Sequence, residues 1–583
     1  MMEVKWCANC NVPIIGEQCD ICGSSGRRCA KDLKPIFGGE RRLFEKLLGI
    51  RLPLFAFRYR NKVISNGRTF LTFKLDTVNK RLIPLSYQKS IDYGEGMDFW
   101  EGIRCTIEAN EEHLKKREEK AIDFINEAAR NYSRTFVLFG GGKDSAVVAM
   151  LAKKVLGNVS LLFVDTTLEF PETYKFVEEF SRTYGFYLIK DDDGEYYRAK
   201  QDFFQLCKRL GPPSIYCRWC CHIFKEQPVK HFIDDHLNDP TDAVFLTGIR
   251  RSESKRRKDY ASIELGRRIV GQTLIQPIND WGDLEVWLYI FWKGIKINDL
   301  YELGHTRVGC WPCPCTPPFM DLIRQLTHAS LWAKFKEVLL DYATKNNRSK
   351  EWVEKGLWRL RKPKRQKIFV SPFHIKEDGD DILFEYLLPH KPTLFEWLKT
   401  LGEIEIDEDK FFKLKTKRGF EVKCSNEGTR VRLIVKCAKK DYVDVKTLIE
   451  KALFRYLNCI KCGACSGSCP KGAIQIIERG RIIINLEKCD RCYSCIKNPC
   501  IIQDSEKMYI IKLDAFLLTP CEKSLPMNHV IFPSEEIGKR VAEALKTRGV
   551  NVEIHEKGRI VCIDTNISKG EIERLVFHVL EGR

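Results

Sequence analysis

The sequence predicts an α/β protein whose core is a doubly wound, mostly parallel sheet. Apolar strands alternate with helix-periodic segments from about residue 135 to residue 290, and such alternation covers both faces of a parallel sheet with helices. A glycine-rich loop at residues 140–145 lies between the first of these strands and its helix. Because 583 residues exceed what one hydrophobic core accommodates, further domains are expected on both sides of this core.

Composition and charge favour a cytosolic enzyme. No run of about 18 apolar residues could span a membrane, and residues 1–10 lack the apolar centre of a signal peptide. The net charge is +18, with dense basic stretches at 250–258 and 359–367, which could follow a nucleic-acid backbone, clamp a polyphosphate or form a solvated surface. Most of the 25 cysteines fall in CxxC clusters, which indicates metal ligation rather than disulfides.

Residues 1–30 are predicted to form a zinc ribbon. Two CxxC pairs, eight residues apart, suit tetrahedral zinc, and the alternative is an unliganded pair of turns. The expected ligands are Cys7, Cys10, Cys19 and Cys22. Short alternating runs then predict a β-rich module over 31–110, which we interpret either as a structural cap on the next domain or as a PUA-like RNA-binding module.

The central domain is expected over 111–320. The pattern predicts helices at 111–134, 145–156 and 174–184, and strands at 135–139 and 159–164. In the loop, three glycines can turn backbone N–H groups toward an oxyanion at a helix N-terminus. Lys143 and the Ser145 hydroxyl would complete this phosphate cradle, and Asp144 would hold Mg²⁺ or the loop; the alternative is a simple tight turn.

The loop, GGGKDS, resembles the SGGxDS signature of the PP-loop superfamily of adenine-nucleotide α-hydrolases, with Gly140 at the serine position. Four later stretches, at 165–173, 248–254, 277–287 and 300–310, are similar in order to motifs of the phosphoadenosine phosphosulfate (PAPS) reductase family. The resemblance covers roughly 130–316 and implies a nucleotide pocket, in which two arginine forks can hold phosphate or sulfate. The candidate nucleotide-binding residues are Gly140, Gly141, Gly142, Lys143, Asp144, Ser145, Asp165, Thr166, Arg250 and Arg251.

Four cysteines in this region resemble the cluster-binding pattern of adenylyl sulfate (APS) reductases, which implies one 4Fe–4S cluster. They are Cys220, Cys221, Cys310 and Cys313, and zinc or unliganded thiols are the alternatives. The ECGLH segment that carries the family's nucleophile is not found. Cys315 and Cys217 are therefore the candidate catalytic thiols, with buried structural cysteines or a different reaction as alternatives.

Residues 321–375 are expected to form a helical extension and basic linker, 376–450 a small α/β module of unassigned role, and 520–583 a small α+β module. Between them, residues 451–510 have the cysteine spacing of a two-cluster bacterial ferredoxin, in which the fourth cysteine of each run ligates the other cluster. One 4Fe–4S cluster is expected on Cys459, Cys462, Cys465 and Cys500, and a second on Cys489, Cys492, Cys495 and Cys469. One cluster plus zinc is the alternative.

Three functions remain open at this stage. The first is reductive sulfur chemistry on APS or PAPS with electrons from the fused ferredoxin. The second is ATP-dependent tRNA thiolation through base adenylation, which would require Mg²⁺ with ATP. The third is a non-enzymatic iron–sulfur electron-transfer subunit. The expected partners are an adenine nucleotide, an electron donor or acceptor and, in the second case, tRNA; no membrane partner is expected.

Overall fold

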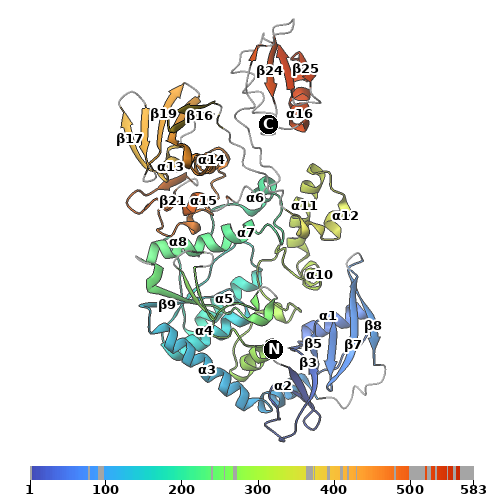
Figure 1. Ribbon diagram of the computed structural model, residues 1–583. Helices are drawn as coiled ribbons and strands as arrows, with labels where there is room; N and C mark the ends of the chain where they lie inside the picture. Colours follow the sequence, from blue (N-terminus) through green and yellow to red (C-terminus); the bar gives the residue numbers. More distant parts are fainter. Residues whose placement is uncertain are drawn as a thin grey trace. The chain divides into compact units, whose positions relative to one another are not determined.

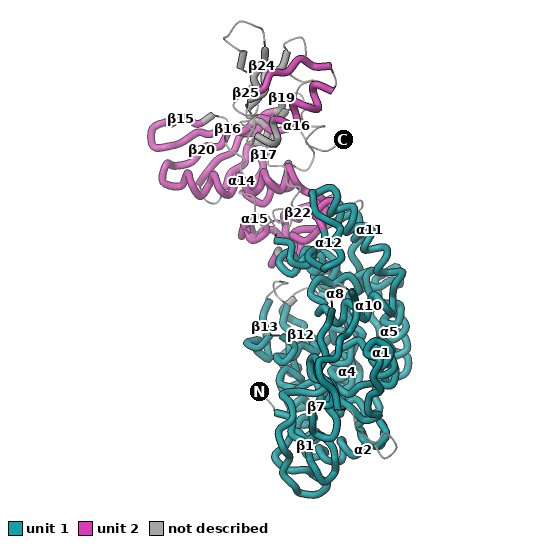
Figure 2. The backbone as a smooth tube through the Cα atoms, turned by 90° about the vertical axis from the view of Figure 1, so that its right-hand side faces the viewer, with its two compact units in different colours: residues 1–208, 212–362 teal, residues 209–211, 363–583 magenta. Residues whose placement is uncertain are grey.

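The computed structural model describes residues 3–362 with short gaps, and parts of residues 372–564 (Figure 1). The residues outside this description are 1–2, 77–78, 89–96, 238–239, 255–256, 267–268, 270–271, 363–371, 373, 390–393, 408–410, 417–418, 428–429, 478–480, 498–499, 501–518, 521–526, 532–534, 548, 556–559 and 565–583. The chain divides into two compact units, residues 1–208 with 212–362 and residues 209–211 with 363–583 (Figure 2).

The core of the first unit is the predicted mostly parallel sheet. Its strands are β9 (Arg134–Leu138), β10 (Ser160–Leu162), β11 (Tyr187–Leu188), β12 (Ala243–Leu246), β13 (Ile263–Leu265) and β14 (Thr273–Ile275). They lie in the order β11-β10-β9-β12-β14-β13, and only the β13–β14 pair is antiparallel. Since the chain leaves β9 toward β10 and returns to β12 on its other side, a ligand crevice is expected at the carboxyl end of β9.

Helices cover both faces of this sheet, which confirms the predicted fold class. One face packs against α3 (Glu111–Ala129), α4 (Lys143–Leu156), α5 (Pro171–Tyr184) and α9 (Asp283–Trp292). The other face packs against α8 (Gln227–His236), where Phe232 and Ile233 bury beside Phe245. The helix predicted over 111–134 ends five residues early, and the other predicted central elements lie within three residues of their expected bounds.

The N-terminal residues form two small sheets. The ribbon contains β1 (Val4–Cys7), β2 (Val12–Ile14) and β3 (Arg27–Ala30), in the order β2-β1-β3. An antiparallel sheet follows, made of β4 (Lys34–Pro35), β5 (Phe57–Tyr59), β6 (Lys62–Ser65), β7 (Arg68–Asp76) and β8 (Arg81–Tyr87), with α1 (Gly38–Leu48) inserted after β4. Ribbon residues, Phe57, α2 (Phe99–Glu108) and α9 share one apolar core, so the ribbon is packed onto the central domain.

The helical extension after residue 317 contains α10 (Pro318–Thr327), α11 (Ala329–Lys345) and α12 (Lys350–Glu354), followed by a 3₁₀ turn (Leu357–Leu360). Most of the expected basic linker, residues 363–371, lies outside the described residues. Among the described helices, none combines the length and apolar character that a bilayer crossing requires.

The second unit begins with a six-stranded antiparallel sheet. Its elements are β15 (His374–Asp378), β16 (Asp381–Pro389), α13 (Leu394–Lys399), β17 (Glu403–Asp407), β18 (Phe411–Lys415), β19 (Glu421–Glu427), β20 (Arg430–Ala438) and α14 (Tyr442–Asn458). The cysteine-rich region adds β21 (Ile474–Ile477), β22 (Arg481–Ile484) and α15 (Ser494–Lys497). One core joins Leu433, Leu453 and Ile474, so the boundary expected at residue 450 lies inside α14, whose apolar face covers both parts.

The C-terminal module contains β23 (Thr519–Pro520), β24 (Met527–Ile531), α16 (Glu535–Lys546), β25 (Val552–His555) and β26 (Ile560–Asp564). These strands form an antiparallel sheet in the order β23-β24-β26-β25. The α+β module predicted over 520–583 is described as far as residue 564, and its remaining residues, 565–583, lie outside the described part of the chain.

Candidate nucleotide and thiolate site

The glycine loop joins β9 to the N-terminus of α4. Gly141 has φ 68°, and a Cβ at that position would lie 2.8 Å from Cγ2 of Thr173, so the turn requires glycine. Gly140 is exposed, and a Cβ there would meet no described atom within 4 Å. An oxyanion can therefore reach the helix N-terminus from the side of Gly140.

The loop is held by residues from distant parts of the chain. The Tyr301 hydroxyl accepts the Lys143 backbone N–H at 2.9 Å, and the Asn298 amide donates to the Gly141 carbonyl at 3.2 Å. The Ser145 hydroxyl donates to the Gly142 carbonyl at 2.9 Å. Ser145 thus closes the loop on itself in this structure and does not extend toward an anion.

A group of four charges stands behind the loop, with two buried cations and two partly exposed carboxylates. It contains the side chains of Lys143, Asp144, Arg250 and Asp283. Lys143 Nζ lies 2.8 Å from Asp144 Oδ2 and 3.0 Å from Asp283 Oδ1. Arg250 Nε donates to Asp144 Oδ1 at 2.6 Å, and its Nη2 donates to Asp283 Oδ1 at 2.9 Å. Two cations and two carboxylates balance one another, as buried charges require.

Electrostatics favours the ionised form of every member of this group. Burial opposes the charged form of Asp283, but Lys143 and Arg250 lower its pKa to about 2. Burial likewise opposes charge on Lys143, whose pKa Asp144 and Asp283 nevertheless raise. The four residues therefore remain a fixed set of ion pairs near neutral pH.

These contacts engage Arg250 and Lys143 with carboxylates, whereas the anion-binding role expected of Arg251 stays a prediction. Arg250 is 3% exposed and directs its donors into the protein, so it offers no free fork in this structure. Lys143 is likewise held by the two carboxylates. Arg251 pairs with Asp280 at 2.6 Å near the surface and donates to the Tyr260 carbonyl at 2.9 Å. Sequence reasoning missed Asp283, although its position at the start of α9 and inside the 277–287 motif is visible in the sequence.

The next expected pocket residues follow β10. Asp165 is buried and accepts the Tyr174 hydroxyl at 2.7 Å and the Thr167 N–H at 2.7 Å. The Thr166 hydroxyl donates to Glu169 Oε1 at 2.8 Å. Burial raises the pKa of Glu169. This short segment is thus stiffened at the carboxyl edge of the sheet, beside the glycine loop.

Thiols from two distant segments meet this edge. The Cys310 Sγ lies 3.6 Å from Thr166 Oγ1 and 3.5 Å from Glu169 Oε1. Cys220 and Cys221 end α7 (Trp219–Cys221), which continues as a π-helical turn (His222–Glu226), and such turns are frequent at functional sites. The segment from Tyr301 to Cys310 therefore connects the glycine loop with the thiols.

One lysine lies among three of the four expected ligands. The negative charges of Cys310, Glu169, Cys221 and Cys313 raise the pKa of Lys225, whose side chain is exposed on the π-helical turn. Arg218 donates to Cys221 Sγ at 3.3 Å. Four thiolates around an iron–sulfur cluster leave net negative charge, which these two cations can offset. The donor set thus fits a cluster.

The two candidate nucleophiles differ in their surroundings. Cys315 is half-buried and hydrogen-bonded to Cys313, and this bond lowers the pKa of Cys313 to about 5 while it raises the pKa of Cys315. Cys217 is 3% exposed, and its backbone N–H donates to the Ser214 hydroxyl at 2.9 Å. Cys315 is therefore the more accessible of the two thiols and lies beside an expected cluster ligand.

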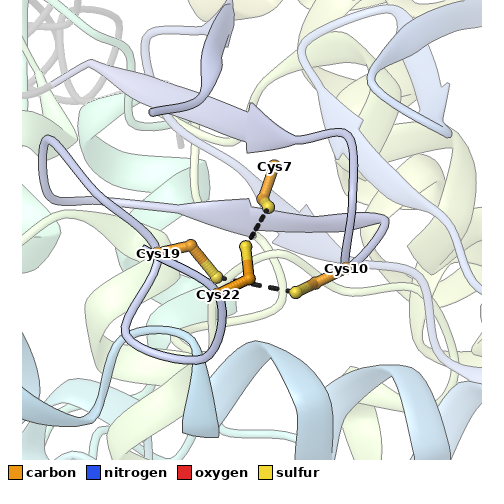
Figure 3. A group of neighbouring side chains, drawn as sticks. All are labelled: Cys7, Cys10, Cys19 and Cys22. Atoms are coloured by element: carbon orange, nitrogen blue, oxygen red, sulfur yellow. Dashed lines mark hydrogen bonds between the residues drawn. The ribbon is translucent and has the colours of Figure 1, made fainter. Parts of the chain in front are cut away.

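The N-terminal cysteines converge as expected for a metal site (Figure 3). The sulfurs of Cys7, Cys10, Cys19 and Cys22 all lie within 4.8 Å of one another. Cys7 and Cys22 are 3.5 Å apart, and Cys10 and Cys19 are 3.8 Å apart. Tetrahedral zinc with Zn–S bonds of about 2.3 Å requires sulfur separations of about 3.8 Å, so the geometry fits zinc.

The ferredoxin-like cysteines form two groups, each with a cysteine from the other run of the sequence. Burial raises the pKa of Cys462 to about 12, and Cys500 and Cys459 add to this shift. Burial raises the pKa of Cys495 to about 12 in the same way, with Cys469, Cys489 and Cys492 as the neighbouring thiols. The fourth cysteine of each run therefore lies with the other run, as in two-cluster ferredoxins.

Sequence reasoning also missed Arg455, a buried residue of α14. Its positive charge acts on Cys465 and Cys459 of one group and on Cys495 of the other. An arginine four residues before the first expected ligand, Cys459, has no distinctive sequence signal, so only the fold brings it to both groups.

Comparisons with known proteins agree with this arrangement. Residues 134–316 match the phosphoadenosine phosphosulfate reductase domain, and residues 454–475 match the 4Fe-4S binding domain. An uncharacterized protein of Methanocaldococcus jannaschii is 36% identical over 269 residues, which cover 46% of this chain and 54% of that protein. The chain thus spans about half the length of this curated relative.

Two further similarities concern sulfonucleotide reductases. The adenosine 5′-phosphosulfate reductase of Neisseria meningitidis serogroup A is 30% identical over 178 residues, which cover 29% of this chain and 67% of that protein. A crystal structure of PAPS reductase from Candida auris in a phosphate complex is 21% identical, with a TM-score of 0.27 over 35% of this chain and 97% of that one.

The fold and site define a PP-loop α/β domain joined to a 4Fe–4S domain and an N-terminal cysteine cluster. Through its central domain, the chain belongs to the PAPS reductase family.

Proposed function

We propose that the protein reduces a sulfonucleotide, APS or PAPS, with electrons delivered through its own ferredoxin domain. The observation that carries this proposal is the segment between Tyr301 and Cys313. It contacts the glycine loop through the Tyr301 hydroxyl and brings Cys310 within 3.6 Å of Thr166. A nucleotide on the loop would therefore have its reactive end close to the thiols.

In this proposal Cys315 is the nucleophile. The Cys315 thiol loses its proton to solvent, its sulfur attacks the sulfate sulfur, and an S–S bond forms. The S–O bond to the phosphate breaks, and AMP or its 3′-phosphate derivative leaves with the electron pair. Two electrons then cleave the S–S bond, which releases sulfite and restores the Cys315 thiolate. Arg218 and Lys225 offset the charge of the sulfate as it approaches.

The iron–sulfur groups have separate tasks. The expected cluster on Cys220, Cys221, Cys310 and Cys313 would, when bound, carry net negative charge near the sulfate, which Arg218 and Lys225 would offset. Groups on the eight ferredoxin cysteines would supply electrons singly, which suits a two-electron reduction. In this proposal the ferredoxin domain replaces a separate thiol protein as the electron donor.

Labelled sulfite release tests the proposal. Anaerobically prepared protein with its iron–sulfur content restored is mixed with ³⁵S-labelled APS or PAPS and a chemical reductant. We expect sulfite from one of the two, and a loss of at least about a hundredfold in Cys315→Ser. Cys217→Ser is the matched control and should retain turnover. Absence of sulfite with both nucleotides in the iron-loaded protein would reject the function.

ATP-dependent RNA thiolation is the second candidate. The net charge of +9 on residues 31–88 favours it, because RNA binding would use this basic β-sheet module. Pyrophosphate release from ATP that increases with added tRNA would support this candidate over the first. If neither sulfite nor pyrophosphate formed, the electron-transfer subunit would be the remaining function.

A further inference from the structure

A cavity of about 580 Å³ lies between the sheet β4–β8 and the central domain. This volume is in the range of small-molecule sites, about 300–1,000 Å³. Its walls include Tyr59, Phe73 and Phe319, and its rim includes the exposed Arg60 and Lys74. Aromatic rings next to cations are the combination that single-stranded nucleic acids use, with bases stacked on rings and phosphates on cations.

The floor of the cavity is polar but nearly balanced in charge. Arg58 is 6% exposed, its Nε lies 3.3 Å from Glu40 Oε1, and its guanidinium stacks 4.5 Å from the Phe319 ring centre. Glu40 also pairs with Lys34, and the carboxylates of Asp32 and Asp283 line the same cavity. Such a floor suits an uncharged base with hydrogen-bonding edges better than a phosphate.

The rim of the cavity is positively charged, unlike its nearly balanced floor. Among the described residues, no carboxylate pairs with Arg60 or Lys74, and Arg60 stacks over the Tyr59 ring at 5.3 Å. Residues 31–88 carry 13 Lys and Arg against four Asp and Glu, a net charge of +9 and half the +18 of the whole chain. Charge concentrated on one module attracts a polyanion rather than a single small anion.

The cavity reaches the candidate active site. Asp283 lies in its wall and is 3.0 Å from Lys143 Nζ, which begins the helix after the glycine loop. A base in the cavity would therefore lie one side chain away from the residues behind the nucleotide loop.

We propose that this cavity binds one nucleotide of a single-stranded nucleic acid, with the base inside and the flanking phosphates on Arg60 and Lys74. The inference goes beyond the reductase proposal and does not depend on it. It names the β-sheet module as the surface that presents a nucleic acid to the central domain.

Fluorescence anisotropy with a labelled single-stranded RNA of mixed sequence tests this binding, with a DNA strand of the same sequence and an RNA duplex as comparisons. Arg60→Ala/Lys74→Ala should weaken RNA binding at least about tenfold. It should also reduce the slope of log K against log salt concentration by about 1.4, because each lost phosphate contact on a single strand contributes about 0.7 to that slope. Tyr59→Leu, which removes a stacking ring, should weaken binding at least about fivefold.

Arg42→Ala/Lys46→Ala is the matched control, because it removes the same charge from exposed positions of α1 outside the cavity. It should weaken binding less than threefold. Equal losses in both double variants, tighter binding of the duplex, or displacement of the strand by equimolar AMP would overturn the proposal. Circular dichroism of each variant verifies folding. Since no turnover is measured, this result is independent of sulfite formation.

Discussion

Arg250 and Arg251 are neighbours in the sequence but should differ in their contribution to stability. Arg250 is 4% exposed in its side chain and holds both Asp144 and Asp283, whereas Arg251 is 37% exposed and pairs with Asp280. Breaking a buried pair by removing one partner costs about 3–5 kcal/mol. Breaking an exposed pair costs about 0–1 kcal/mol. Arg250→Met should therefore destabilise the first unit several times more than Arg251→Met.

Differential scanning calorimetry of the full chain measures this difference. The first unit, residues 1–208 and 212–362, has an unfolding entropy of about 0.75 kcal/mol/K from a per-residue value of about 2.1 cal/mol/K. Arg250→Met should then lower the melting temperature of this unit by about 4–7 °C, and Arg251→Met by less than about 1.5 °C. Equal shifts for the two variants would refute the four-charge group.

Three further predictions concern other groups. Cys19→Ser should abolish zinc binding measured by elemental analysis, whereas Cys29→Ser, outside the quartet, should retain it; zinc in both variants would contradict the ribbon site. Arg455→Met removes a positive charge beside both ferredoxin groups and should lower both midpoint potentials by on the order of 50 mV in EPR-monitored titrations. The exposed control Lys461→Met should shift the potentials less. If Arg455→Met shifted neither potential, a cation shared by the two groups would be excluded. Burial and Asp283 raise the pKa of Asp32 from 3.8 to about 6, so the folded state holds this proton more tightly than the unfolded state. The free energy of unfolding should therefore decrease as the pH rises from about 4 to about 6. Asp32→Asn should remove this part of the decrease in melting temperature with rising pH.

The order of elements in the central domain could be predicted because local signals agree there. Strand 134–138, the glycine loop and helix 143–156 each carry their own pattern, and their succession fixes a parallel sheet. The antiparallel sheet of β15–β20 could not be predicted, since its pairing joins β16 to β20 across about forty residues. The boundary expected at residue 450 does not separate two domains, because α14 packs against both the β15–β20 sheet and the cysteine-rich region.

The residue types of the candidate site were predicted from the sequence, but the contacts between them were not. The glycine loop and the cysteines follow from spacing, whereas the partners of Arg250 and Lys143 depend on a carboxylate more than 30 residues from either. Lys225 lies inside the predicted cysteine motif, yet only the fold places its charge among thiolates of two segments. Pairwise charge relations of this kind have no local sequence signature.

Mass spectrometry of a covalent adduct tests the central claim that a nucleotide on the glycine loop faces the thiols. Iron-loaded protein is incubated with APS or PAPS without reductant, quenched in acid and digested without thiols. The account predicts the added mass of one SO₃ group on the peptide that contains Cys315, and its loss in Cys315→Ser. An SO₃ adduct on no cysteine, or only on cysteines outside the first unit, would contradict the account.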